Sequence, residues 1–151
     1  MDNLQVARYF SILDGRSRSY VIEACRPLKL TYSEYILLLR IFDMEGASQE
    51  DLSRVLQTDK SAVARTLKLL EQKGFICREK DEVDRRIKRM YLTEYGRMQH
   101  TFLLSVMNRW VDHLAKALPP EELDVVERGF RLLAERSKNA DFAKIIERTQ
   151  R

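Results

Sequence analysis

The sequence contains few of the residues that interrupt helices or cross-link a chain. Its 151 residues include only five glycines and three prolines, a composition that favours long helices with short connections. The two cysteines, Cys25 and Cys77, lie far apart with no CxxC spacing, which argues against a disulfide framework and a zinc site. The two histidines, His100 and His113, are too far apart on one predicted helix to share a metal ion. We therefore expect no metal or other cofactor.

Long apolar runs are also missing. No stretch approaches the roughly 18 consecutive apolar residues that a membrane-spanning helix needs. The first residues, MDNLQVARYF, do not combine a basic segment with a long apolar one, as a secretory signal does. No Ser/His/Asp set or pair of carboxylates stands out as catalytic machinery. These absences predict a cytoplasmic protein that is not an enzyme and has no membrane partner.

Charge, by contrast, is abundant and unevenly distributed. Charged residues make up 33% of the chain, and the formal net charge is +4. From Arg54 to Arg97 there are 12 Lys and Arg against 7 Asp and Glu, whereas the rest of the chain has 15 against 16. A protein that neutralises phosphates needs such a local excess of positive charge. Surface helices also carry Lys and Arg in proteins that bind no nucleic acid, so charge alone leaves both interpretations open.

The stretch from Ser48 to Gly96 has the element order of a winged helix-turn-helix. Ser48 and Asp59 suit helix N-caps, and Gly74 suits the end of a helix. The pattern predicts two helices and then two strands, at Gln49–Leu56, Lys60–Lys73, Phe75–Lys80 and Ile87–Leu92. This order indicates double-stranded DNA as the partner.

The second of these helices carries the residue types that contact DNA. Small residues near its N-terminal end allow close approach to a major groove, and its hydroxyl and basic groups can reach phosphates and base edges. The loop between the two strands, the tip of the wing, adds further arginines. The residues predicted to contact DNA are Ser48, Lys60, Ser61, Ala62, Ala64, Arg65, Lys68, Arg85, Arg86 and Lys88. A solvated charged surface is the alternative interpretation.

Apolar residues at helical spacing predict further helices on both sides of this stretch. Pro27 ends the first of them, Thr31 and Glu34 form a capping box for the second, and Pro119 and Pro120 separate the last two long ones. The predicted ranges are Asn3–Cys25, Tyr32–Met44, Glu94–Leu118 and Glu121–Ser137, with a short helix within Asn139–Arg151. The predicted fold class is mainly α: a winged helix-turn-helix with a two-stranded β-hairpin wing and flanking helices.

Nearly the whole chain resembles the multiple antibiotic resistance regulator (MarR) family of bacterial transcription factors. The resemblance rests on a series of short motifs in a fixed order. These are Leu52-x-x-Val55-Leu56, Asp59-Lys60-Ser61-x-Val63-x-Arg65, Leu70-Glu71-x-Lys73-Gly74-Phe75-Ile76, Asp84-Arg85-Arg86 and Leu92-Thr93-x-x-Gly96. By this resemblance, Asp84 holds Arg86 in a salt bridge, and Arg86 enters a minor groove, where negative potential attracts arginine.

The resemblance also implies a homodimer that binds a palindromic operator. Its dimerisation region would combine the N-terminal helix in residues 1–30 with the C-terminal helices in residues 97–151. The winged helix-turn-helix DNA-binding domain would occupy residues 31–96. The expected dimer contacts are Val6, Phe10, Leu103, Trp110, Leu123 and Phe130.

The function implied is a sequence-specific DNA-binding transcriptional regulator, expected to be a repressor released by a small aromatic or phenolic ligand. Candidate ligand contacts are Tyr9, Arg16, Tyr20, Tyr32, Tyr35, Arg40 and Phe42, with Arg18 as a further anion partner. Ordinary core and hinge packing would explain the same aromatic residues. Two other functions stay open: a redox-sensing regulator acting through Cys25, and a winged-helix protein-interaction module that does not bind DNA.

Overall fold

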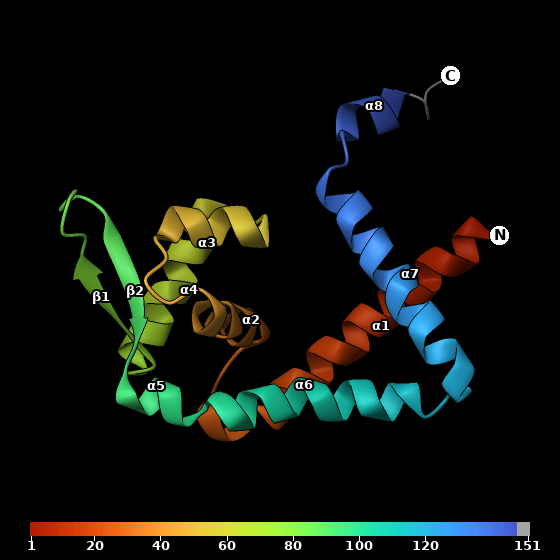
Figure 1. Ribbon diagram of the computed structural model, residues 1–151, viewed down its shortest axis with the longest axis horizontal. Helices are drawn as coiled ribbons and strands as arrows, with labels where there is room; N and C mark the ends of the chain where they lie inside the picture. The colour runs from red at the N-terminus through yellow and green to blue at the C-terminus, as the bar shows by residue number, and fades with distance from the viewer. Residues whose placement is uncertain (148–151) are drawn as a thin grey trace. The chain divides into compact units, whose positions relative to one another are not determined.

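The computed structural model describes residues 1–147 and is mainly helical, with one two-stranded antiparallel sheet (Figure 1). Its elements are α1 (Asn3–Ala24), a 3-10 turn η1 (Arg26–Leu28), α2 (Tyr32–Asp43), α3 (Gln49–Leu56), α4 (Lys60–Gln72), β1 (Ile76–Lys80), β2 (Lys88–Leu92), α5 (Glu94–Met98), α6 (His100–Ala115), α7 (Pro120–Lys138) and α8 (Phe142–Glu147). The helix-turn-helix followed by a hairpin confirms the predicted fold class.

Side-chain caps set the helix starts where the sequence predicts them. Thr31 and Glu34 form the expected capping box of α2. Ser48 and Asp51 form another at α3, and the Asp59 carboxylate accepts the first free N–H groups of α4. Each cap satisfies backbone donors that have no partner inside the helix. These short-range signals therefore place α2, α3 and α4 at the expected residues.

The prediction of a single helix over Glu94–Leu118 is wrong, because the structure contains two helices there, α5 and α6, separated at Gln99. Thr93 caps α5 by accepting the N–H of Gly96, at 3.0 Å. Gly96 itself lies against the backbone of Phe75, so closely that a Cβ atom built on it would be 2.1 Å from the Phe75 carbonyl oxygen. This packing ties α5 to the start of the hairpin, a long-range contact that helical spacing does not reveal.

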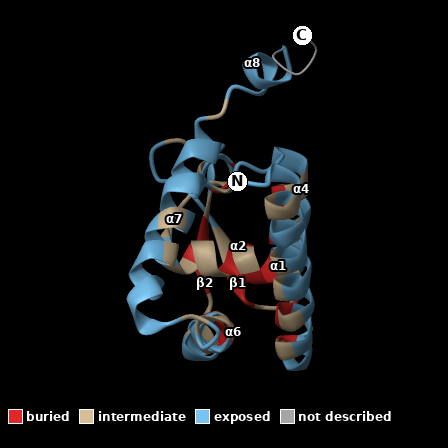
Figure 2. Ribbon diagram, turned by 90° about the vertical axis from the view of Figure 1, so that its right-hand side faces the viewer, coloured by how far each residue is buried: buried red, intermediate tan, exposed pale blue. Residues whose placement is uncertain are grey.

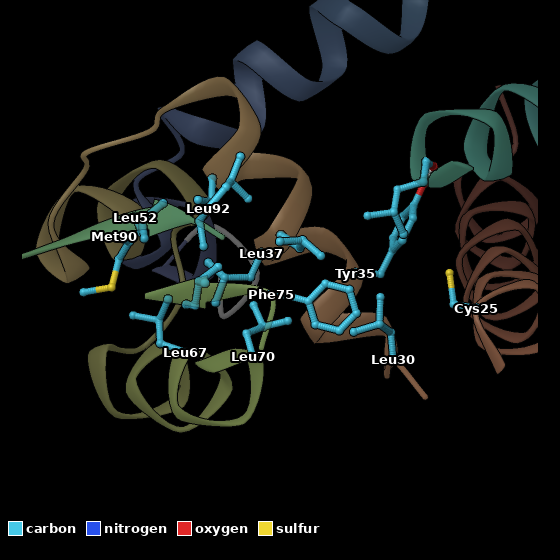
Figure 3. Packing of buried hydrophobic residues seen from close by; sticks show 14 of the residues in the cluster. Cys25, Leu30, Tyr35, Leu37, Leu52, Leu67, Leu70, Phe75, Met90 and Leu92 are labelled. Carbon is cyan, nitrogen blue, oxygen red and sulfur yellow. Dashed lines mark hydrogen bonds between the residues drawn. The ribbon is translucent and has the colours of Figure 1, made fainter. Parts of the chain in front are cut away.

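The core of the winged region forms where α2, α3, α4 and the hairpin meet. Figure 3 shows the labelled apolar side chains of these elements pointing toward one another. The fully buried residues include Leu37, Leu52, Leu67, Leu70 and Phe75. Burying each of these side chains contributes about 1.5–3 kcal/mol relative to exposure. The core therefore fixes the orientation of α4 relative to the hairpin.

The chain divides into two compact units, residues 1–111 and the residues from Asp112 onward. The predicted boundaries at 30/31 and 96/97 differ from this division. Val21 and Cys25 of α1 and Leu103 and Val106 of α6 are buried in the same core cluster as the winged region. The helices expected to flank the DNA-binding domain are thus partly built into it.

This packing changes the expected set of dimer contacts. Leu103 is fully buried within its own chain, so it has no surface to offer a partner. Trp110 is half-buried, stacks on Tyr20 at 5.0 Å between ring centroids and donates to Ser17 Oγ at 2.8 Å. Helical spacing correctly indicated an apolar stripe on this helix, but it did not show which surface covers the stripe.

The other expected dimer residues remain accessible. Val6 is half-buried, while Phe10, Leu123 and Phe130 are exposed. No described residue of α7 or α8 is buried, as the pale colour of α7 shows (Figure 2). Within residues 1–147, no helix is both long and apolar enough to cross a membrane.

Candidate nucleic-acid interface

The start of α4 presents the predicted contact residues in a prearranged form. The Asp59 carboxylate accepts the N–H groups of Ser61 and Ala62, at 3.0 and 3.1 Å, and also the Ser61 hydroxyl. The Ser61 hydroxyl and these N–H groups lower the pKa of Asp59. Ala62 and Ala64 are half-buried and leave little bulk beside the helix axis.

The cations of this region are exposed, and some already have partners. Lys60 Nζ lies 3.0 Å from a carboxylate oxygen of Glu50, and both side chains are exposed. Arg65 points its guanidinium toward Ser61, with 3.5 Å between Nη1 and Oγ, and Lys68 is exposed. Such exposed contacts are weak, because water screens the charges, so a phosphate can replace them.

Ser48 serves mainly as a cap. Its hydroxyl donates to the Asp51 carboxylate at 2.7 Å, and its backbone N–H donates to the same oxygen at 3.0 Å. These Ser48 contacts lower the pKa of Asp51. These contacts fix Ser48 and Asp51 relative to each other at the start of α3.

The tip of the wing holds Arg86 in an exposed position, paired with Asp84. The Arg86 Nε and Nη2 atoms each lie 3.0 Å from an oxygen of Asp84, and the Arg86 N–H donates to Asp84 at 3.1 Å. The Asp84–Arg86 salt bridge implied by the resemblance is present, and it lowers the pKa of Asp84. The Arg86 side chain is 91% exposed, and Arg85 and Lys88 are exposed as well.

The base of the wing contains contacts that the sequence did not predict. Residues 46–48 run antiparallel to β2: the Gly46 N–H donates to Met90, and the Met90 N–H donates to Ala47. Arg89 of β2 donates to the Asp81 carboxylate and, at 3.0 Å, to the Gly46 carbonyl oxygen. An Asp and an Arg on opposite sides of a predicted hairpin loop are a weak signal that would have suggested this pair.

Four of the ten predicted DNA contacts, Ser48, Lys60, Arg86 and Lys88, line one hollow, here called the wing-side hollow. The other six do not line it: Ser61, Ala62, Ala64, Arg65, Lys68 and Arg85. The hollow has a volume of about 360 Å³. It is lined by Ser48, Gln49, Glu50, Lys60, Arg78, Arg86, Ile87, Lys88 and Met90. Arg78, which was not predicted, lies 3.1 Å from Glu71 of α4 through its Nε atom. Cations separated widely in the sequence thus surround one open concavity.

A second concavity, here called the α2–α4 hollow, has a volume of about 250 Å³. It is lined by Arg18, Tyr32, Ser33, Ile36, Leu37, Leu56, Thr58, Ala62, Val63 and Thr66. Arg18 lies over the ring of Tyr32, 4.5 Å from its centroid, and forms an ion pair with Asp14 at 2.9 Å. That contact with Asp14 raises the pKa of Arg18.

The structure does not bring the seven predicted ligand residues together. Among them, Tyr32 alone lines the α2–α4 hollow. Tyr35 is buried and donates to the Leu103 carbonyl oxygen at 2.9 Å, and Phe42 stacks on His100 at 4.2 Å. Packing within the chain explains both, as it does Tyr20, which stacks on Trp110. The aromatic residues followed helix faces in the sequence, but those faces meet different neighbours.

The remaining predicted ligand residues lie elsewhere on α1 and α2. Tyr9 is exposed and accepts a hydrogen bond from Gln5 at 3.0 Å. Arg16 is exposed, and Arg40 pairs with Asp43 at 3.5 Å. None of these three side chains lines either hollow.

Cys25 lies in the core rather than at the surface. It is fully buried, and burial raises the pKa of its thiol to about 11. Oxidants attack the thiolate, so the raised pKa suppresses the reactivity of Cys25 at neutral pH. Burial suppresses it further, because it keeps oxidants from reaching the sulfur. This environment suits a structural thiol and does not favour the redox interpretation.

Comparison with known proteins agrees with this geometry. The MarR family model matches residues 30–88. The uncharacterised HTH-type transcriptional regulator YybA of Bacillus subtilis (strain 168) is 36% identical over 78 residues, and the matched part covers about half of each chain, 52% of both.

Two solved structures share the fold over most of the chain. A crystal structure of MarR has a TM-score of 0.81 and 31% identity, covering 91% of this chain and 93% of that one. Streptococcus pneumoniae FabT in complex with DNA has a TM-score of 0.76 and 23% identity, covering 91% and 99%. With its winged helix-turn-helix and this similarity along nearly its full length, the chain belongs to the MarR family.

Proposed function

We propose that the protein is a sequence-specific transcriptional regulator that binds double-stranded DNA and has no enzymatic activity. One observation carries the proposal: Lys60 of α4 and Arg86 and Lys88 of the wing line the same open hollow. Neutralising phosphates requires cations grouped on one exposed surface. A member of the same family of folds, FabT, has been crystallised with DNA, which supports this interpretation.

In the proposed complex, α4 enters a major groove through its N-terminal half. Lys60 exchanges Glu50 for a phosphate, while Arg65 and Lys68 reach base edges or the backbone. Arg86, whose guanidinium is held by Asp84, enters the neighbouring minor groove from the wing tip. Arg85 and Lys88 add phosphate contacts on either side of it.

The proposal includes a homodimer that binds a palindromic operator. The apolar surface of the C-terminal unit supports it, because large exposed apolar patches mark interaction sites. Leu123, Val125, Phe130, Leu132 and Leu133 of α7 are all exposed. Two copies would present two α4 helices to successive major grooves.

The proposal also includes repression relieved by a small aromatic ligand. The α2–α4 hollow supports a site for it, because the hollow combines apolar walls with the Arg18 cation and the Tyr32 ring. A ligand that fits one spacing of the two DNA-binding lobes of the dimer better than another shifts the population away from the DNA-competent state. Tyr35, which is buried, and Phe42, which stacks on His100 of α6, take no part in this proposed site.

The test of DNA binding compares the wild-type chain with Arg86→Ala on duplexes selected from genomic DNA. We expect the wild-type protein to prefer the selected duplex over a random one and its affinity to fall with salt. Arg86→Ala should bind more weakly, with the logarithmic salt slope reduced by about one. Equal retention of selected and random duplexes at all salt concentrations would contradict sequence-specific binding. Retention of neither duplex would contradict DNA binding and favour a protein-interaction module.

The test of ligand release titrates salicylate-like compounds into the protein–DNA complex. Release of DNA by the wild type, with a weaker response from Tyr32→Ala, supports the α2–α4 hollow as the effector site. Tyr9→Ala is the matched aromatic control, because Tyr9 lies outside both hollows. Equal responses from the two variants would place the effector elsewhere.

A further inference from the structure

Arg89 occupies a different environment from the other cations of the wing. Its Nε donates to the Asp81 carboxylate and its Nη1 donates to the Gly46 carbonyl oxygen at 3.0 Å. Its side chain is 37% exposed and that of Asp81 only 12%, compared with 91% for Arg86. The guanidinium is therefore engaged with the protein on two sides.

Asp81 carries the contact from Arg89 onward to the tip of the wing. One Asp81 carboxylate oxygen accepts the backbone N–H groups of Val83 and Asp84, at 3.0 and 2.8 Å, while the other accepts from Arg89. Asp84 in turn holds Arg86. A continuous series of hydrogen bonds thus runs from Gly46 through Arg89, Asp81 and Asp84 to the exposed Arg86.

The other end of this series reaches the helix-turn-helix. Gly46 lies between α2 and α3, and its N–H donates to the Met90 carbonyl of β2 at 2.8 Å. Ser48, which forms a β-bridge with Arg89, is the N-cap of α3. The segment from Gly46 to Ser48 is therefore fixed to both the wing and the first helix of the motif.

We propose that Arg89 is a positioning residue that sets the place of the wing-tip Arg86 relative to α4 without contacting DNA. The inference rests on the proposed DNA-binding function. It adds to that function the group that fixes the wing tip relative to α4. Its logic is preorganisation: a loop fixed before binding loses less conformational freedom when it meets the duplex. Breaking the series at Arg89 should loosen the tip while leaving every proposed phosphate contact in place.

The first experiment measures the wing without DNA. Hydrogen exchange of the Val83 and Asp84 amides is compared in the wild type, Arg89→Met and Arg26→Met. Arg26 is the matched control, an exposed arginine that pairs with Glu23 at the end of α1. We expect faster exchange of these two amides in Arg89→Met alone, with unchanged exchange in the core amides of α4. Unchanged exchange at Val83 and Asp84 would overturn the proposal.

The second experiment measures affinity against salt for a selected duplex. Arg89→Met should weaken binding roughly 3- to 30-fold, a loss within the range of coupling energies between members of one hydrogen-bond network. Its salt slope should remain that of the wild type, because no phosphate contact is lost. A slope reduced by about one, as expected for Arg86→Ala, would show that Arg89 touches a phosphate and would overturn the positioning role.

Two further variants keep the test decisive if Arg89→Met folds poorly. In Asp81→Asn the side-chain oxygen can still accept the loop amides, but the charge-assisted bond to Arg89 is lost. It should therefore weaken binding, and adding Arg89→Met should weaken it little further. Arg89→Lys should recover part of the affinity because an ammonium can reach one acceptor but lacks the planar fork of arginine.

The outcomes separate this inference from the function on which it rests. If the wild type binds no duplex, the proposed function fails, while the exchange measurement still reports whether Arg89 holds the tip. If the wild type binds but Arg89→Met and Asp81→Asn bind equally well, the function stands and the positioning role is excluded. Additive losses in the double variant would likewise exclude a shared series of contacts.

Discussion

Lys73 Nζ, at the C-terminal end of α4, lies 2.6 and 2.8 Å from the two carboxylate oxygens of Glu34 in α2. The same ammonium donates to the Lys29 carbonyl oxygen at 2.6 Å. The Glu34 side chain is 1% exposed and also caps α2 through the Thr31 N–H. The proposed DNA-reading helix is thus joined to α2 by an ion pair with a buried carboxylate, and to the segment between η1 and α2 by a hydrogen bond.

Replacing Lys73 should destabilise the fold strongly. Lys73→Met leaves the buried Glu34 carboxylate without its cation, a change that costs about 3–5 kcal/mol when both partners are fully buried. Because Lys73 is 29% exposed, we expect about 3 kcal/mol in urea unfolding. The double variant Glu34→Gln/Lys73→Met removes the unpaired charge and should recover part of this loss. A Lys73→Met protein as stable as the wild type would contradict the role of the pair.

Gly96→Ala should disturb the joint between α5 and the hairpin. The new Cβ would lie 2.1 Å from the Phe75 carbonyl oxygen, so the backbone must move. Overpacking of this kind typically costs about 1–3 kcal/mol, and a clash with backbone belongs at the upper end. Gly15→Ala is the control, because nothing lies within 4 Å of its Cβ position in α1. That variant should be unchanged or stabilised by about 0.5–1 kcal/mol, and equal melting temperatures for both variants would be incompatible with the close approach at Gly96.

The fold should lose stability at alkaline pH through Cys25 and Tyr35. Burial raises the pKa of Cys25 to about 11 from 9.0 and that of Tyr35 to about 12 from 10.0. Since the folded state holds both protons to higher pH than the unfolded state, its stability is full below pH 9 and falls as the pH rises toward 12. Urea midpoints measured across this range should fall less steeply for Cys25→Ala and for Tyr35→Phe. A wild-type midpoint that stays constant would refute this.

Arg65→Ala separates base reading from general attraction. If Arg65 contacts a base, its loss should weaken specific binding by about 1–3 kcal/mol and relax the preference at one position of the operator. Lys68→Ala is the comparison, since a phosphate contact should weaken binding to all duplexes alike. Selection of bound sequences from a random pool for each variant measures both effects. An unchanged preference and affinity in Arg65→Ala would remove it from the set of reading residues.

Sequence patterns predicted the elements whose signals are local. The capping box at Thr31, the Ser48 and Asp59 caps and the end of α4 near Gly74 depend on residues within one helical turn. Such contacts form the same way in many surroundings, so the residues themselves are enough to indicate them. The Asp84–Arg86 pair also lies within one loop, but it was expected from the family resemblance.

Contacts across the fold escaped prediction for a physical reason. Helical spacing identifies the apolar face of Leu103 or Tyr35 but not the surface that covers it, and the structure buries both inside one chain. The Lys73–Glu34 pair joins residues 39 positions apart, and Arg89 reaches Gly46 across 43. These pairs depend on where whole helices pack, which only the assembled core decides.

Gly46 has a positive φ of 86°, and the ring of Tyr91 lies 3.5 Å from where its Cβ would be. A side chain there would be strained by the positive φ, and its Cβ would already be in van der Waals contact with the Tyr91 ring. The backbone at Gly46 therefore helps to fix the orientation of the hairpin relative to α3 and α4. In the proposed complex, substitutions at exposed residues of α4 would change which bases are preferred, while the spacing between the major-groove and minor-groove contacts would stay constant. If the proposed function holds, this chain can acquire new operator preferences without a change in its backbone geometry.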